Sequence, residues 1–262
     1  NLLSADVVTA QGELIRASAE ENADLFWGLR GGGGNLGVVT AFTFRLHPVG
    51  PEVLAGLVVF PFDEAGAILR RYRAFVATAP EALTVWTVLR QAPPLPFLPE
   101  AIHGRPVVVM PLLHAGDPGE GERLLASIRA LGTPVGEHVG RIPFVAWQRA
   151  FDPLLAPGAR NYWKSHDLAS LSDAALDVMI AHAARLPAPD CEIFLAHLGG
   201  AAGRVPATAT AYPHRDATFI VNLHARWRDK VQDDACVGWA RDFFEAMRPH
   251  ATGGVYVNFL TA

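Results

Sequence analysis

Three polar side chains alternate with apolar ones along residues 219–226, where β-branched and aromatic residues predict a strand. Because successive side chains of a strand point to opposite faces, Asn222, His224 and Arg226 share one face and the apolar residues take the other. A face with an amide, an imidazole and a guanidinium could bind and orient a small polar substrate. Asn222 cannot act as a general base, so it would act through hydrogen bonds. A solvated sheet face is the alternative, and it stays open.

Tyr162 is the second candidate for chemistry. A tyrosine can take a proton from a substrate hydroxyl if a nearby cation lowers its pKa. If this segment is extended, Lys164 lies on the same side of the chain and provides such a cation. The alternative is a tyrosine at the edge of a domain, with a packed ring and a solvated hydroxyl.

A run of four glycines, Gly31–Gly34, lies between an expected short helix at 22–29 and an expected strand at 38–46. Such a run loses much backbone entropy on folding, and a simple turn needs only one or two glycines. We expect the chain either to pass close to another group here or to turn several N–H groups inward. The run lacks the ending of a Walker A loop, and a helix precedes it, unlike the dinucleotide-binding fingerprint. A structural tight loop remains the alternative.

The elements that must position these residues alternate between strands and amphipathic helices. The patterns predict further strands at 2–9, 13–18, 53–60, 83–89, 106–114, 192–198, 218–227 and 255–260. They predict longer helices at 63–78, 118–131, about 170–186 and 231–247. Several connections are too long for hairpins. The sequence therefore predicts an α+β fold, with a mostly antiparallel sheet and helices covering one face.

The first expected unit ends near Pro48 and the pair Gly50-Pro51, and we place a domain boundary there. The strand before it has Phe42, Phe44 and Leu46 alternating with polar residues, which predicts one buried face. The chain thus divides into expected domains at 1–50 and 51–262.

Composition excludes several classes of function. Half of the residues are hydrophobic and 18% are charged, enough for a sizeable core. The net charge of −4 does not favour a nucleic acid or an anionic membrane, and no stretch approaches the roughly 18 apolar residues of a membrane span. Cys191 and Cys236 cannot form a disulfide framework or a zinc site by themselves, and no histidine pattern suggests a metal. We therefore expect a small-molecule substrate, no metal and a cytoplasmic location.

Residues 21–40 read ENADLFWGLRGGGGNLGVVT, and this segment resembles one found in the FAD-linked oxidases of the berberine-bridge-enzyme-like family. Weaker similarities to that family occur at 160–165 (RNYWKS), 197–205 (HLGGAAGRV), 211–217 (AYPHRDA) and 254–259 (GVYVNF). The resemblance therefore spans nearly the whole chain. It implies that 1–50 is the C-terminal portion of a PCMH-type FAD-binding domain and that 51–262 is a substrate-binding α+β domain.

The resemblance also implies roles for particular residues. The loop backbone would contact FAD at Gly33, Gly34, Asn35, Gly37 and Val38. The candidate catalytic residues are Tyr162 and Asn222, and Asn222 stands where plant members of the family place a catalytic acid or amide. The candidate substrate-binding residues are Lys164, His224, Arg226, Tyr256 and Asn258, the last two expected on one face of the final strand.

The activity implied by the resemblance is oxidation of a C–OH or C–H donor by proton abstraction and hydride transfer to flavin N5, with dioxygen as acceptor. The family's N-terminal half, its covalent flavin-attachment residues and its extreme C-terminal segment find no match here. We therefore expect the chain alone to bind FAD poorly, and the missing segment to be a partner. Two alternatives stay open: a non-catalytic chain that binds a small molecule or a partner, and a flavin-binding half on a separate polypeptide. Family members oxidise sugars, alkaloids, alcohols and antibiotic precursors, so the substrate is not predicted.

Overall fold

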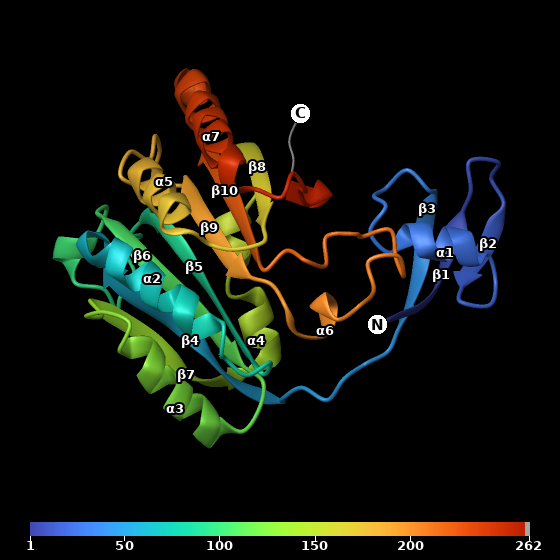
Figure 1. Cartoon of the computed structure of the whole chain (residues 1–262), viewed down its shortest axis with the longest axis horizontal. Coiled ribbons are helices and arrows are strands. Elements are labelled where there is room, and N and C mark those ends of the chain that lie inside the picture. The colour runs from blue at the N-terminus through green and yellow to red at the C-terminus, as the bar shows by residue number, and fades with distance from the viewer. Residues whose placement is uncertain (260–262) are drawn as a thin grey trace. The chain divides into compact units, whose positions relative to one another are not determined.

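The computed structural model describes residues 1–259, which form two compact units (Figure 1). One unit contains Asn1–Pro48 and Gly199–Asp216, and the other contains Val49–Leu198 and the residues from Ala217 onward. The boundary expected at residue 50 lies next to the first passage of the chain between the units. The assignment of a flavin-binding and a substrate-binding domain stays a prediction.

The segment Gly199–Asp216 was expected in the domain 51–262, but it packs with the N-terminal residues. Two hydrogen bonds hold it there: Trp27 Nε1 donates to Thr208 O at 2.8 Å, and Ala211 N donates to Trp27 O at 3.2 Å. These contacts join positions more than 180 residues apart, and no local sequence pattern records such a pairing.

The smaller unit contains a three-stranded antiparallel sheet in the order β2-β1-β3. Its strands are β1 (Leu2–Val8), β2 (Leu14–Ser18) and β3 (Val38–Phe44), and its helices are α1 (Ala23–Leu29) and the single turn α6 (Gly200–Gly203). The core of this unit consists of Ala5, Val7, Ala17 and Phe26. The predicted hairpin of the first two strands is confirmed.

The predicted buried face of β3 is wrong. Phe42, Phe44 and Leu46 are 56%, 52% and 86% exposed. The core of this unit is formed by residues of β1, β2 and α1, and Val39 is the one residue of β3 that packs against it. Alternation therefore predicted the two faces of the strand but not which of them other residues cover.

The larger unit is built on a seven-stranded sheet in the order β7-β4-β6-β5-β9-β10-β8, and every pair of neighbours is antiparallel. Its strands are β4 (Glu52–Pro61), β5 (Leu83–Gln91), β6 (Pro106–His114), β7 (Gly136–Pro143), β8 (Arg160–Leu168), β9 (Glu192–His197) and β10 (Phe219–Trp227). The predicted α+β fold with a mostly antiparallel sheet is confirmed. The sequence patterns did not predict β7. Two of its eight residues are glycines and none of the eight is buried, so it lacks the apolar pattern of a strand.

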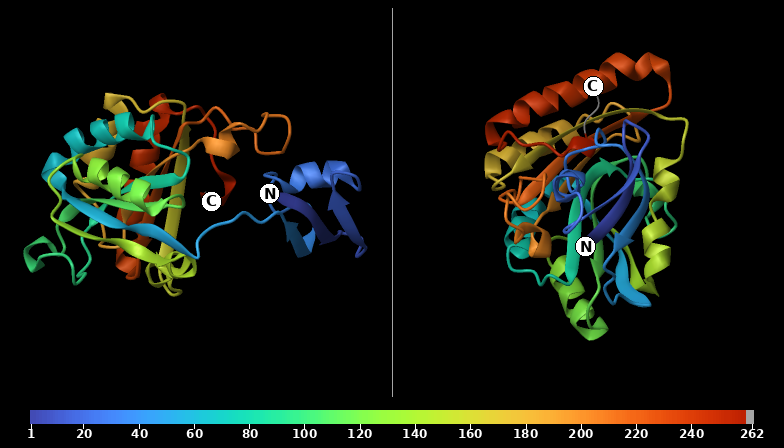
Figure 2. Two further views of the ribbon diagram at one scale, coloured as in Figure 1. Left: turned by 90° about the horizontal axis from the view of Figure 1, so that it is seen from below. Right: turned by 90° about the vertical axis from the view of Figure 1, so that its right-hand side faces the viewer.

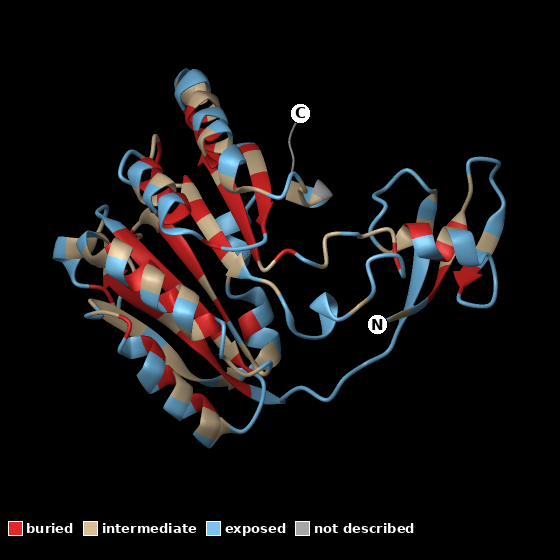
Figure 3. Ribbon diagram, in the orientation of Figure 1, coloured by how far each residue is buried: buried red, intermediate tan, exposed pale blue. Residues whose placement is uncertain are grey.

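Helices cover one face of this sheet (Figures 1 and 2). The helices of the unit are α2 (Ala65–Val76), α3 (Pro118–Arg129), α4 (Phe144–Arg149), α5 (Asp173–Ala183) and α7 (Asp233–Met247). The main core lies between the sheet and α2, α3, α5 and α7, whose inward sides are buried (Figure 3). The short helix α4 packs on the opposite face through Trp147, against Val53 and Ala55 of β4.

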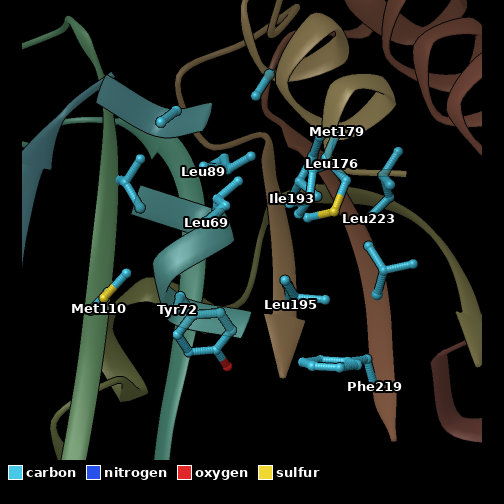
Figure 4. Packing of buried hydrophobic residues seen from close by; sticks show 14 of the residues in the cluster. Leu69, Tyr72, Leu89, Met110, Leu176, Met179, Ile193, Leu195, Phe219 and Leu223 are labelled. Carbon is cyan, nitrogen blue, oxygen red and sulfur yellow. The ribbon is translucent and has the colours of Figure 1, made fainter. Parts of the chain in front are cut away.

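The main core is continuous across six strands, β4, β6, β5, β9, β10 and β8. Met110, Leu89, Leu195 and Leu223 come from four neighbouring strands and point toward the helices (Figure 4). Tyr72 of α2 lies among them, and its hydroxyl donates to Val85 O at 3.0 Å, so the one polar atom of this side chain is satisfied. Arg90, Glu192 and His224 have the opposite parity on these strands and lie on the other face.

The strand predicted at 255–260 is wrong for the residues described. The chain forms a 3₁₀ turn there, η6 (Val257–Phe259), in which Phe259 N donates to Tyr256 O at 2.9 Å. Residue 260 lies outside the described residues. The remaining 3₁₀ turns are η1 (Phe62–Glu64), η2 (Glu100–Ile102), η3 (Asp152–Leu155), η4 (Lys230–Gln232) and η5 (Arg248–His250). Within residues 1–259, no helix is both long enough and apolar enough to cross a membrane.

Candidate functional site

Four polar or aromatic residues form a row across neighbouring strands, on the sheet face away from the main core. In the register of the sheet Arg90 of β5 lies opposite Glu192 of β9, Glu192 lies opposite His224 of β10, and His224 lies opposite Trp163 of β8. Directly opposed residues of antiparallel strands point to the same face. The sheet therefore brings together side chains that are up to 134 positions apart.

A chain of hydrogen bonds runs along this row. Arg90 Nη1 donates to Glu192 Oε2 at 2.8 Å, and the other oxygen, Oε1, lies 2.8 Å from His224 Nδ1. On the far side of the ring, His224 Nε2 lies 2.7 Å from Asn222 Nδ2. An amide nitrogen can only donate, so in this arrangement Nε2 accepts and the ring proton is on Nδ1, facing the carboxylate.

Aromatic rings fix the plane of His224. Trp163 stacks on the imidazole with centroids 4.3 Å apart and an interplanar angle of 17°. Phe194 lies parallel to it at 6.0 Å and 11°. Phe259 of η6 approaches both His224 and Trp163 edge-on, at 6.4 and 6.2 Å. The imidazole is thus held both in its plane and at both nitrogens.

The carboxyl group of Glu192 is held ionised by its neighbours. Burial raises its pKa, but the hydrogen bond with His224 and the charges of Arg90, His224 and Arg226 lower it by more. The net pKa is below the usual range of a glutamate. A carboxylate at this position keeps the Nδ1 proton of His224 in place and would stabilise an imidazolium.

A cavity of about 100 Å³ opens beside this row. Its lining residues are Arg90, Pro153, Leu154, Leu155, Trp163, Asp190, Glu192, His224, Arg226 and Arg228. The side chains of Glu192 and His224 are 18% and 17% exposed, so the pair reaches the cavity. Within the described part of the chain, no group of three or more His, Cys, Asp or Glu side chains could hold a metal ion.

The shared face predicted for Asn222, His224 and Arg226 is confirmed, and the alternative of a solvated face is wrong. Asn222 is fully buried, and Arg226 is 7% exposed. The Arg226 guanidinium donates from Nη1 to Asn161 Oδ1 at 3.0 Å and from Nη2 to Ala156 O. Asn222 therefore contacts His224 and not the cavity, while Arg226 fastens the loop after η3 to the sheet.

Tyr162 and Lys164 lie on the opposite face of the sheet from Asn222. Tyr162 pairs with Ala225, on the side of the main core, and its hydroxyl accepts from Arg241 Nε of α7 at 3.1 Å. Lys164 Nζ lies 5.2 Å from the Tyr162 ring centre, as expected for an extended segment. The two predicted catalytic residues are thus not brought together, because their positions on paired strands have opposite parity.

The side chain of Tyr162 has the electrostatic environment that the sequence predicted. Burial raises its pKa, but the hydrogen bond from Arg241 and the charges of Lys164 and Arg241 lower it by more, so its net pKa is below that of an ordinary tyrosine. An acidified phenol on this face is adjacent to α7, however, and not to the cavity beside His224.

Tyr256 and Asn258 do not share a strand face, because they lie at the 3₁₀ turn η6. Asn258 Nδ2 donates to Tyr256 OH at 2.7 Å, and the Tyr256 ring packs edge-on against Phe259 at 5.0 Å. They are linked to the site through Phe259, which contacts His224 and Trp163. Their predicted roles in binding substrate or flavin stay predictions.

The glycine loop follows α1, and the reason why a glycine is needed differs from one position to the next. Gly31 and Gly37 have φ of +122° and +126°, and a Cβ at either would lie within 2.8 Å of backbone atoms of Tyr212 or Val8. Gly33 has φ of +85° and no neighbour within 4 Å. Gly34 has neither a positive φ nor a neighbour within 4 Å, so packing within the chain does not require a glycine there.

The contrast between Gly34, which nothing in the chain requires to be glycine, and Gly31 and Gly37, which packing requires, tests whether the loop fits a cofactor. A glycine without steric or conformational need is explained where another molecule approaches the backbone closely. Asn35 is exposed, and Val38 is 68% exposed at the start of β3. Gly34 and the exposed Asn35 therefore fit the predicted flavin contact, whereas the positive φ of Gly33 already explains a glycine there. Gly37 is already explained by its approach to β1.

Sequence reasoning missed Arg90, Glu192 and the ring of Phe194. A weak signal was present: Arg90 stands one residue before the end of β5, and Glu192 begins β9, and most residues of both strands are apolar. Their meaning depends on the order β5-β9-β10, which joins strands distant in sequence. Trp163 lies in the segment 160–165 that resembles the family, but the sequence did not predict a role for it.

No protein-family model matches the chain, but its curated relatives are FAD-linked oxidoreductases. One from Dictyostelium discoideum is 27% identical over 259 residues, which cover 97% of this chain and 54% of that protein. The chain spans about half the length of the curated relatives it matches.

Solved structures with the same fold include berberine-bridge-enzyme-like proteins. The chain matches BBE-like 28 from Arabidopsis thaliana with a TM-score of 0.83 and 21% identity, covering 100% of this chain and 56% of that one. It matches a xylooligosaccharide oxidase from Myceliophthora thermophila, solved with xylobiose, with a TM-score of 0.74 and 22% identity, over 97% and 55% of the two chains. The predicted resemblance is confirmed, and the relatives support FAD as the cofactor.

Proposed function

We propose that the chain forms part of an FAD-dependent oxidoreductase that oxidises a C–OH or C–H donor, with the Glu192–His224 pair as proton acceptor. One observation carries the proposal: both side chains of the pair line the cavity, while Arg90, Asn222 and Trp163 hold them in place. Proton abstraction needs a basic group that is both oriented and accessible. The contacts of the pair orient His224, and Nε2 becomes available to a substrate when the Asn222 amide, which donates to it in this arrangement, turns away.

The flavin, when bound, accepts hydride at N5 and passes the electrons to an acceptor, for which we propose dioxygen. The backbone at Gly33, Gly34 and Asn35 would hold it. Gly34 supports this assignment, because it has no positive φ and a Cβ there would meet no chain atom within 4 Å. A structural neighbour that is named an oxidase supports dioxygen as the acceptor.

The substrate proton is taken up by the Glu192–His224 pair as a unit. Before uptake the ring proton is on Nδ1, facing the carboxylate, and the ring is neutral. After uptake His224 carries protons on both nitrogens, and the Glu192 carboxylate stabilises the imidazolium. The amide of Asn222 turns, so that its Oδ1, which is buried and has no hydrogen-bond partner among the described residues, accepts from Nε2.

The pair is preferred to Tyr162 because of the face on which each lies. Tyr162 packs toward α7, and its hydroxyl is engaged by Arg241. A proton acceptor at Tyr162 and a substrate held by Asn222 or His224 would lie on opposite sides of one sheet. We therefore assign Tyr162 and Lys164 to the packing of α7, and Asn222 to positioning His224.

Rapid anaerobic mixing of the flavin-loaded protein with a panel of aromatic and sugar alcohols tests the proposal. We expect His224→Gln to slow flavin reduction by about 100-fold or more, the usual contribution of a general base. Tyr162→Phe is the matched control and should change the rate by less than about twofold if it does not touch the substrate. The proposal fails if Tyr162→Phe slows reduction as much as His224→Gln does. Hydrogen peroxide formed when air is admitted checks the acceptor.

A further inference from the structure

The strongest unexplained charge in the larger unit is that of Arg226. Arg226 is 7% exposed, and its guanidinium donates to two neutral oxygens, Asn161 Oδ1 and Ala156 O. No carboxylate of residues 1–259 pairs with it within salt-bridge distance. A buried cation with neutral acceptors alone is costly, and an anion placed beside it offsets that cost.

The other charges of the cavity are already balanced. Arg90 pairs with Glu192 at 2.8 Å with both side chains mostly buried, and Arg228 lies 4.0 Å from Asp190 at the exposed rim. Three arginines and two carboxylates line the cavity, so one positive charge remains. That charge is on Arg226. Burial raises the pKa of Glu192, and His224 and Arg90 lower it; the charge of Arg226 makes a smaller contribution in the same direction as theirs.

One wall of the same cavity is apolar and unusually open. Leu154 and Leu155, from η3, are 44% and 55% exposed although both line the cavity beside Arg226. Arg226 also fixes this wall, because it donates to the carbonyl oxygen of Ala156, the residue after η3. A cationic floor and an apolar wall are therefore parts of one built arrangement.

We propose that this cavity is an anchor for an apolar carboxylic acid, the carboxylate lying at Arg226 and the aromatic or aliphatic body against Leu154 and Leu155. The volume of about 100 Å³ suits one end of a ligand, since pockets that enclose whole ligands measure roughly 300–1,000 Å³. A planar guanidinium matches the geometry of a carboxylate. The binding of an acid at Arg226 does not depend on the proposed function. Only the further statement that this acid is the substrate rests on it; His224 would then take the proton from a hydroxyl or C–H group of the acid away from the carboxylate.

Calorimetric titration of the purified chain at pH 7 tests the anchor. The probes are trans-cinnamate, its neutral analogue cinnamamide, inorganic phosphate and the sugar cellobiose. We expect cinnamate to bind at least about tenfold more tightly than cinnamamide, a difference of about 1.4 kcal/mol. Phosphate and cellobiose, which lack an apolar body, should bind more weakly than cinnamate. Equal binding of acid and amide, or no binding of either, overturns the proposal.

Variants locate the preference for the acid. Arg226→Gln should reduce it to less than about twofold, while Arg228→Gln at the exposed rim should retain it. Because Arg226 also fastens a loop, the exposed Leu155 provides a second test that does not disturb the fold. Leu155→Asp should weaken cinnamate binding at least about tenfold more than the neutral Leu155→Asn, through repulsion of like charges. Retention of the preference in both Arg226→Gln and Leu155→Asp overturns the proposal.

The anchor and the proposed function can fail separately. Cinnamate binding without any flavin reduction by oxidisable donors would refute the oxidoreductase proposal and leave the anchor standing. Flavin reduction by neutral sugar alcohols, with no preference for acids, would refute the anchor and leave the oxidoreductase proposal standing.

Discussion

Glu192 Oε1 lies 2.8 Å from His224 Nδ1, and the two residues are direct cross-strand partners of β9 and β10. The strand register therefore sets this distance, with no contribution from a mobile loop. The same carboxylate accepts from Arg90 through its other oxygen. One side chain thus links a fixed cation to the imidazole that lines the cavity, and its removal should have measurable effects on stability and on pH dependence.

Glu192→Gln should lower the free energy of unfolding of the larger unit by about 1–3 kcal/mol, because it leaves the mostly buried Arg90 without its charged partner. Glu245→Gln is the control: its pair with Arg248 is exposed and should contribute less than about 0.5 kcal/mol. Urea unfolding followed by circular dichroism measures both. Equal losses in the two variants would show that the Arg90–Glu192 pair is no stronger than a surface pair.

The lowered pKa of Glu192 predicts a specific dependence of stability on pH. A carboxyl whose folded-state pKa is lowered adds stability above its unfolded-state pKa of about 4.3, and loses it as pH falls through the folded-state pKa. The difference in unfolding free energy between wild type and Glu192→Gln should therefore be constant near neutral pH and shrink below about pH 4. Other acidic groups contribute equally to both proteins and cancel. A difference that grows on acidification would contradict the predicted sign.

The sequence predicted the strand 218–227 and the shared face of Asn222, His224 and Arg226 because alternation is a local property. The order β5-β9-β10 could not be predicted from local patterns. Because that order brings Arg90 and Glu192 next to His224, this contact could not be predicted either. The relation of Tyr162 to Asn222 depends on the β8–β10 register, in which Tyr162 opposes Ala225. Periodicity gives the two faces of each strand separately, and only pairing decides which faces coincide.

The glycine loop offers a pair of neighbouring tests with opposite expectations. Gly31→Ala should destabilise the smaller unit by more than about 2 kcal/mol, because φ is +122° and the new Cβ would lie 2.6 Å from Tyr212 N. Gly34→Ala should leave stability unchanged or raise it by up to about 1 kcal/mol. Hydrogen exchange of peptides from residues 1–48 measures both effects.

Gly34→Ala should nevertheless weaken FAD binding by about tenfold or more if the loop backbone lies against the flavin, since a Cβ would enter the contact. Retention of flavin after dialysis measures this, with the variant and wild type each combined with the missing flavin-binding segment. Unchanged flavin retention would mean that the glycine at 34 does not mark a flavin contact.

The phenol of Tyr162 should ionise before that of Tyr72 as pH rises. Its pKa is lowered because the effects of Arg241 and Lys164 outweigh burial, whereas burial raises the pKa of Tyr72. Stability linked to Tyr162 is therefore absent at pH 7, appears as pH rises through its folded-state pKa, and is complete above the unfolded-state value of about 10. Ultraviolet titration of phenolate should lose a step below the ordinary tyrosine pKa of about 10 in Tyr162→Phe and keep that step in Tyr72→Phe. Arg241→Gln should move the step to higher pH, because it removes the donor to the Tyr162 hydroxyl. A loss of no step below about pH 10 in Tyr162→Phe would show that the Arg241 contact does not acidify this phenol. It would also remove the electrostatic basis for any role of Tyr162 in proton transfer.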